Sequence, residues 1–98
     1  MAMYASIRRY VVHPGSIGEI ARQVNKCSLP IIRDIPGFVA YYTVDVGHGV
    51  GISFSIFEDQ AGAERSAAAS REYIKENLAS LFPNPPEIMD GEVLVNAP

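Results

Sequence analysis

The sequence predicts an α+β domain in which two helices cover one face of a four-stranded antiparallel sheet. The first observation behind this prediction is the order of the elements. Segments rich in β-branched and aromatic residues alternate with segments of helical apolar spacing, in the order strand, helix, strand, strand, helix, strand. The second observation is a short glycine-containing loop between the middle two strands, which makes them a hairpin. The order βαββαβ is that of the ferredoxin-like fold, and we expect a single domain over residues 1–98.

The first predicted strand covers residues 3–12, and a His-Pro-Gly turn at residues 13–15 ends it. Ser16 begins the first helix, and Glu19 three positions later completes a capping box, in which each side chain bonds the other residue's backbone N–H. The apolar stripe of this helix consists of Ile17, Ile20, Ala21, Val24 and Cys27.

Proline residues divide the rest of the helical sequence. Pro30 has no backbone N–H, so we expect it to kink or break the first helix, with a short second piece running up to residues 36–37. Asp59 is the predicted N-cap of the second helix, which ends at the proline-rich residues 82–86. The last strand is predicted over residues 87–95. The inner stripe of the second helix consists of Ala63, Ala67, Ser70, Ile74, Leu78 and Leu81.

The hairpin consists of predicted strands 38–46 and 50–57, joined by residues 47–49. A three-residue loop needs glycine at its last position, where the backbone is left-handed, and Gly49 is there. With this register one side of the hairpin is continuously apolar: Phe38, Ala40, Tyr42, Val44, Val46, Val50, Ile52, Phe54 and Ile56. The other side is mixed: Val39, Tyr41, Thr43, Asp45, Gly51, Ser53, Ser55 and Phe57. A slip of one residue would exchange the two sides.

Charge and composition exclude several classes of function. The net charge is −3 and no basic run extends beyond residues 8–9, so we expect no binding of nucleic acid. No apolar run is long enough to span a bilayer, which predicts a cytoplasmic protein with no membrane partner. Cys27 is the single cysteine, so no intrachain disulfide forms. His13 and His48 lack the spacing of metal ligands, so no metal site is expected.

Both sides of the hairpin cannot belong to the core of one monomer, and a large exposed apolar face implies a partner. Three short motifs accompany this arrangement: Pro-Gly at residues 14–15, Pro-Gly-Phe at 36–38, and Phe-Glu-Asp at 57–59. Together with the element order, they resemble the dimeric α/β-barrel superfamily, and within it the antibiotic biosynthesis monooxygenase-like domain. The resemblance covers nearly the whole chain.

The resemblance implies a homodimer in which two sheets pack face to face through their apolar sides. It implies a ligand cavity between the mixed side of the sheet and the helices, and no cofactor. Oxygenases of this family act on electron-rich aromatic or quinol-like molecules, which themselves react with O2. The family often has a tryptophan at the end of the third strand, where this chain has Phe57 before Glu58. Arg8 matches an asparagine that some members place in the cavity.

The residues on the mixed side are consistent with such a cavity. Gly51 and Ser53 lie beneath a helix that carries Ala63 and Ala67, so small side chains leave volume unfilled. A mostly apolar pocket with a few converging polar groups is the usual form of a small-molecule site. The candidate catalytic residues are Arg8, Tyr10 and Tyr41. The candidate substrate-binding residues are Arg8, Tyr10, Tyr41, Thr43, Ser53, Ser55, Phe57 and Tyr73.

Simpler interpretations remain open beside these. Arg8 can be a rim arginine paired with Asp45 or a glutamate, and Tyr10 and Tyr41 can be core tyrosines with satisfied hydroxyls. The protein can be a cofactor-independent monooxygenase-like enzyme, a non-catalytic small-molecule-binding or stress-response dimer, or a purely structural assembly unit. The chain contains no tryptophan, and its second helix has no histidine, which removes groups that some active members use.

Overall fold

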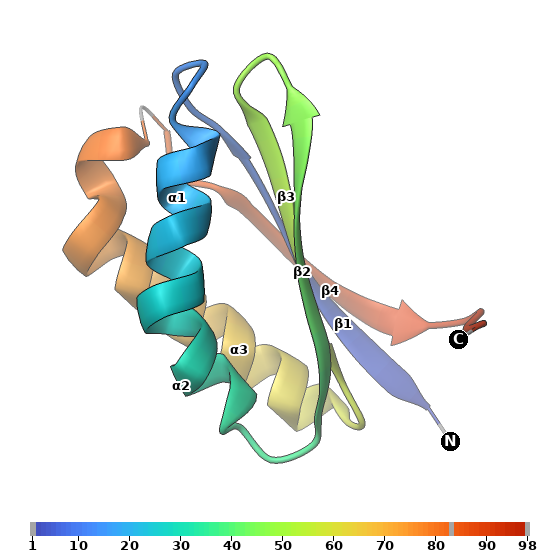
Figure 1. Ribbon diagram of the computed structural model, residues 1–98. Coiled ribbons are helices and arrows are strands. Elements are labelled where there is room, and N and C mark those ends of the chain that lie inside the picture. Colours follow the sequence, from blue (N-terminus) through green and yellow to red (C-terminus); the bar gives the residue numbers. More distant parts are fainter. Residues whose placement is uncertain (1, 83, 98) are drawn as a thin grey trace.

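The computed structural model describes residues 2–82 and 84–97, and its elements follow the predicted order βαββαβ. The strands are β1 (Met3–Val11), β2 (Phe38–Gly47), β3 (Val50–Phe57) and β4 (Glu87–Val93). The α-helices are α1 (Ile17–Gln23), α2 (Leu29–Arg33) and α3 (Gln60–Tyr73). The strands form one antiparallel sheet in the order β2-β3-β1-β4, and all helices lie on one of its faces (Figure 1). The predicted ferredoxin-like fold is confirmed.

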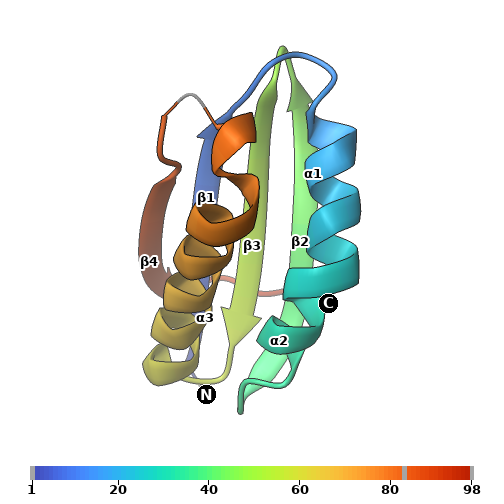
Figure 2. The same ribbon diagram turned by 90° about the vertical axis from the view of Figure 1, so that its left-hand side faces the viewer.

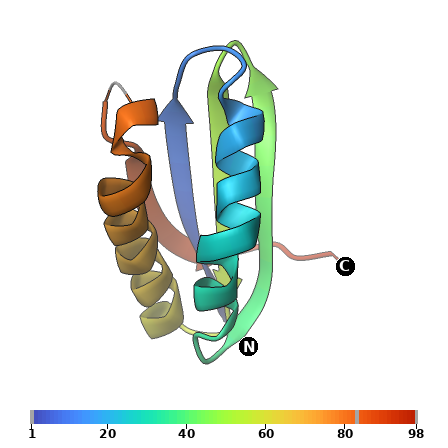
Figure 3. The same ribbon diagram turned by 60° about the vertical axis from the view of Figure 1, so that its left-hand side comes forward.

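Two helical segments cover the sheet side by side. One contains α1 and α2, and the other, the α3 segment, consists of α3, a π-helical turn (Ile74–Leu78) and a 3-10 turn (Ala79–Leu81). Figure 2 shows α1 and α2 in front of β2, and α3 toward β1 and β4, with β3 visible between them. Figure 3 shows the same arrangement from a second angle. The central strands β1 and β3 therefore supply the residues that lie beneath the junction of the two segments. No helix of the described residues is both long and apolar enough to cross a membrane.

The first helical segment includes the short second helix that the sequence predicts, α2, but the irregularity lies before Pro30 rather than at it. A π-helical turn, Val24–Ser28, joins α1 to α2, and Pro30 lies in the first turn of α2, where a missing N–H costs little. A π-helical turn contains an extra residue, so it rotates the following residues about the helix axis. For this reason Cys27, predicted on the inner stripe, is exposed, and Ile32 is buried while Ile31 is exposed.

The two predicted helix caps have different outcomes. Asp59 is the N-cap of α3, and its carboxylate accepts a hydrogen bond from the backbone N–H of Gly62 at 2.8 Å, as predicted. Ser16 precedes α1 but makes no side-chain cap, so the predicted capping box is wrong. Glu19 instead pairs with Arg22 one turn along the helix.

The hairpin turn contains two residues rather than the predicted three. His48 and Gly49 form it with φ values of 56° and 79°, and a bulge interrupts the pairing between Asp45 and Gly47. The turn is one residue shorter than predicted, and the bulge places one extra residue in β2, so the two differences compensate each other in the strand register. The predicted pairing of Tyr42 with Phe54 is therefore retained, and so is the sorting of residues 40–45 and 51–56 between the two faces.

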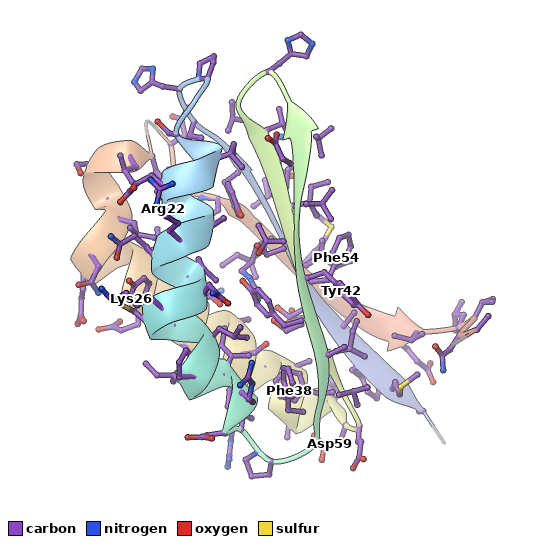
Figure 4. All side chains as sticks on the ribbon, viewed as in Figure 1. Arg22, Lys26, Phe38, Tyr42, Phe54 and Asp59 are labelled. Atoms are coloured by element: carbon purple, nitrogen blue, oxygen red, sulfur yellow. The ribbon has the colours of Figure 1, made fainter. Side chains whose placement is uncertain are left out.

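A second bulge changes the face of one aromatic residue. The pairing shifts between Phe38 and Ala40, so Phe38 lies on the helix-covered face and not on the predicted apolar side. Its ring meets that of Phe57 edge to face, with centroids 5.8 Å apart. Figure 4 shows Phe38 pointing toward the helices, whereas Tyr42 and Phe54 point to the other side of the sheet. We call the helix-side surface of the sheet the covered face and the opposite surface the open face.

Candidate functional site

A buried arginine lies at the centre of the covered face. Arg8 is on the central strand β1, opposite Ser53 of β3, and its residue is only 2% exposed. Its Nη1 donates a hydrogen bond to Ser6 Oγ at 3.0 Å, and its Nη2 donates one to Ser55 Oγ. Its guanidinium carbon lies 5.8 Å from the ring centroid of Tyr41, a distance typical of a cation–π interaction.

Within the described residues, Arg8 forms no ion pair with a carboxylate. Desolvation by burial lowers the pKa of Arg8, while Tyr41, Tyr10 and the more distant Asp90 act in the opposite direction. A buried charge that lacks a counterion is costly, and an anion brought to it would remove part of that cost. The alternative prediction, a rim arginine paired with Asp45 or a glutamate, is wrong, because Arg8 is buried and pairs with no carboxylate of the described residues.

Hydroxyl groups surround the guanidinium on the sheet. Tyr10 Oη lies 3.0 Å from Ser53 Oγ, which also lies 3.1 Å from Thr43 Oγ1. Burial is the main reason that the pKa of Tyr10 is raised, so its phenol stays neutral and can donate a hydrogen bond. Gly51 makes room for the tyrosine ring, because a Cβ at this position would lie 2.4 Å from Tyr10 Cε2. The rings of Tyr10 and Phe82 are nearly perpendicular, with an interplanar angle of 79° and centroids 5.5 Å apart.

A small central hollow lies between these groups and the helices. Five candidate residues line it: Arg8, Tyr10, Tyr41, Ser53 and Tyr73. Its volume is about 20 Å³, which is room for about one water molecule. The predicted cavity is thus in the predicted place, but it is much smaller than a substrate.

The other three candidates lie outside the hollow. Ser55 supports Arg8 from beneath, and Thr43 supports Ser53 and faces a groove beside α1. Phe57 is fully buried in a separate apolar cluster, where a Cβ on Gly62 would come within 2.6 Å of its ring. Its position is that of a packing residue.

Sequence reasoning missed several residues that the structure brings to the site. Ser6 accepts a hydrogen bond from Arg8. Strand side chains alternate between faces, so the position of Ser6 two residues before Arg8 predicts that both lie on the same face. Ser28 lines the hollow from the π-helical turn Val24–Ser28, which no sequence pattern announced. Phe82 lies beyond the end of the helix, and only the path of the returning chain brings it against Tyr10.

Two larger grooves lie beside the central hollow. The groove between α1 and β2 has a volume of about 260 Å³ and shares Val24 and Tyr41 with the hollow. The groove between the end of the α3 segment and β4 has a volume of about 380 Å³ and shares Ile74 and Phe82 with it. These four side chains separate a water-sized hollow from ligand-sized space. Val24 and Ile74 each begin a π-helical turn, a feature frequent at functional sites.

The chemistry available in the hollow is limited to binding and hydrogen bonding. No aspartate, glutamate or histidine is among the described residues that line it. No three side chains of the metal-ligating types come together in the described part of the chain. The hollow therefore offers one cation and several hydroxyls, an arrangement that suits an anionic oxygen.

Comparison with known proteins supports the fold. No family model matches the chain, and no curated protein matches it significantly. A crystal structure of a protein of unknown function from Nitrosomonas europaea is similar with a TM-score of 0.80 and 24% identity, over 99% of this chain and 94% of that one.

Two similar structures are oxygenases by description. The ActVA-Orf6 monooxygenase of Streptomyces coelicolor, solved with nanaomycin D, has a TM-score of 0.76 and 15% identity over 96% of this chain and 89% of its own. SnoaB, a cofactor-independent oxygenase from Streptomyces nogalater, has a TM-score of 0.66 and 16% identity over 98% of this chain and 95% of its own. The protein thus has the ferredoxin-like fold of the antibiotic biosynthesis monooxygenase-like proteins, as the resemblance predicted.

Proposed function

We propose that the protein is a cofactor-independent, monooxygenase-like enzyme that acts on a small aromatic molecule bound between sheet and helices. The observation that carries this proposal is Arg8, a buried cation with two serine hydroxyls and no carboxylate within ion-pair distance in the described residues. Such a group is costly in a purely structural core, but it stabilises an anion that forms in a dry site. The likeness of the fold to two oxygenases supports the same class of reaction.

The reaction that suits this site begins with a substrate that is itself acidic, such as a phenol or an enolisable ketone. Because no carboxylate or imidazole of the described residues lines the hollow, the proton passes to water, and Arg8 stabilises the resulting anion. The neutral phenol of Tyr10 donates a hydrogen bond to the same oxygen. The electron-rich carbon then reduces O2 and forms a carbon–oxygen bond, giving a hydroperoxide that loses water. The balance is one CH2 group and one O2 converted to one carbonyl and one water.

Ligand binding in this proposal requires the hollow to widen. Its volume of about 20 Å³ is far below that of an aromatic ring system. Rotation of Tyr41 or Phe82 would join it to a neighbouring groove. The π-helical turns that begin at Val24 and Ile74 also contribute to its lining. We therefore expect substrate binding to be accompanied by movement of these side chains.

Oxygen consumption with a hydroxylated anthrone is the direct test. We expect turnover by the wild type, a loss of at least about a hundredfold in Arg8→Gln, and partial activity in Arg8→Lys, which retains the charge. Arg65→Gln, at an exposed position on α3, is the matched control and should retain full activity. Equal rates for Arg8→Gln and wild type would rule out this role of Arg8.

A second candidate function is the binding of a small molecule without catalysis, as in a stress-response protein. The lack of an aspartate, glutamate or histidine among the described residues that line the hollow favours this alternative, because no such side chain is there to act as a general base. Under this alternative, a phenolic ligand would bind in an Arg8-dependent manner without consumption of oxygen. Calorimetric titration together with the oxygen assay separates the two functions.

The open face supports a homodimer formed by face-to-face packing of two sheets. Tyr42, Val44 and Met89 are 60%, 45% and 48% exposed, although each lies in the middle of a strand. Exposed apolar surface of this kind is characteristic of a protein interface. Sedimentation velocity at micromolar concentration tests this part of the proposal, and a monomer would contradict it.

A further inference from the structure

The groove between the end of the α3 segment and the start of β4 has a volume of about 380 Å³. Its volume falls within the range of small-molecule sites, about 300 to 1,000 Å³. Its wall is almost entirely apolar and is formed by Ile74, Ala79, Phe82, Pro86 and Ile88. It lies on the helix side of the edge strand, away from the open face that the proposed dimer would cover.

Two cations line this apolar groove. Arg71 and Lys75 are four residues apart on the α3 segment, and both are exposed. Neither forms an ion pair with any described residue, whereas Arg9 pairs with Glu87 at 3.4 Å. Lys75 does act on Glu76 at longer range, but that glutamate does not line the groove. The groove therefore combines an apolar wall with positive charge.

We propose that this groove binds a small amphipathic anion, with an apolar aromatic or aliphatic body and one acidic group. The body would lie against the apolar wall, and the acidic group would be held by Arg71 and Lys75. Charge complementarity favours an anion over a neutral or cationic molecule. The site does not depend on Arg8, since it shares only Ile74 and Phe82 with the central hollow.

The test uses two fluorescent probes of nearly the same shape, added to the full chain. One is 8-anilinonaphthalene-1-sulfonate, and the other is N-phenyl-1-naphthylamine, which lacks the sulfonate. We expect the double variant Arg71→Gln/Lys75→Gln to bind the sulfonate probe about tenfold more weakly at low salt and to bind the neutral probe as before. Added salt should weaken sulfonate binding in the wild type and have little effect in the variant.

Two further variants locate the probe. Ala79→Trp fills the groove and should reduce binding of both probes at least about tenfold, while Ala68→Trp on the exposed side of α3 should change neither. Arg8→Gln should leave the binding of both probes unchanged, because Arg8 does not line this groove. A failure of the proposed enzymatic function, which depends on Arg8, can therefore be distinguished from a failure of this proposal. Unaltered sulfonate affinity in Arg71→Gln/Lys75→Gln, or unaltered binding in Ala79→Trp, would overturn the proposal. A change of sedimentation coefficient in Ala79→Trp would also overturn it, because the occupant would then be a second copy of the chain.

Discussion

The two faces of the sheet have the opposite distribution of polar and apolar side chains from that expected in a monomer. The covered face has polar residues at its buried centre, whereas the open face exposes apolar side chains to solvent. In a monomeric protein the buried side chains are mainly apolar and the solvent-exposed ones are mainly polar. The buried polar residues of the sheet are Ser6, Arg8, Ser53 and Ser55. This difference is the basis of both proposals, a ligand site on the covered face and a dimer interface on the open face.

The largest expected effect comes from charging the open face. Val44→Asp places a carboxylate in each half of the proposed dimer interface, and we expect it to weaken dimerisation about a thousandfold, or about 4 kcal/mol. Val44 is 45% exposed, so the monomer should tolerate the change. Sedimentation equilibrium measures the dissociation constant, with Ala68→Asp on α3 as the control. An unchanged dimer would mean that copies associate through another surface.

The second prediction concerns whether the buried charge of the covered face lowers the free energy of unfolding. Arg8→Met replaces the buried guanidinium by an apolar side chain, and we expect it to raise the free energy of unfolding by about 2 kcal/mol while removing ligand binding. Urea denaturation measures the change. Arg8→Lys keeps the charge and should give no such gain. A loss of stability in Arg8→Met would show that Arg8 serves the core rather than a ligand.

A third change disturbs the covered face without altering its charge. The new Cβ of Gly51→Ala would collide with the ring of Tyr10 and approach Ile17 Cδ1 at 3.1 Å. We expect the free energy of unfolding to fall by about 1.5 kcal/mol and the hydrogen bond from Tyr10 to Ser53 to be displaced. Gly91→Ala on β4 is the matched control, because its added Cβ meets nothing within 4 Å. Equal urea midpoints for the two variants would contradict this packing.

The smallest effect is a dependence of stability on pH. Burial raises the pKa of Tyr10 above its ordinary value of about 10, so the folded state holds this proton more tightly than the unfolded state. Its contribution is present below pH 10 and is lost as the pH rises further, at no more than about 1.4 kcal/mol per pH unit. Urea denaturation at a series of pH values up to 11 should show a shallower decline in Tyr10→Phe than in the wild type. Tyr42→Phe on the open face is the control.

Local signals in the sequence predicted most of the fold but not every orientation. Asp59 caps its helix as its residue type predicts, because an N-cap depends on three neighbouring positions. Cys27 is exposed and Phe38 lies on the covered face, and both positions differ from the prediction. The reason is that a π-helical turn and a β-bulge each insert one residue into a regular repeat. The positions of such insertions depend on tertiary packing, so they cannot be predicted from the spacing of apolar residues.

The candidate site was predicted in part for the same reason. Arg8, Tyr10, Tyr41, Ser53 and Tyr73 meet at one hollow as expected, since strand alternation and sheet order bring them together. The family resemblance predicts Phe57 at the cavity, whereas the structure places it in a separate cluster with Phe38. The position of Phe82 does not follow from strand alternation or helical spacing, because it lies in the connection between Leu81 and β4, outside the regular elements.

By itself, the sequence determined the order of the elements and the division of the hairpin into an apolar and a mixed side, because both depend on periodicities within a few residues. Only the tertiary structure decided that Arg8 is buried without a carboxylate partner among the described residues, and that the hollow beside it holds about 20 Å³. Both facts depend on how closely two helical segments approach the sheet. That distance is set by the summed packing of side chains from every element, which no short stretch of sequence contains.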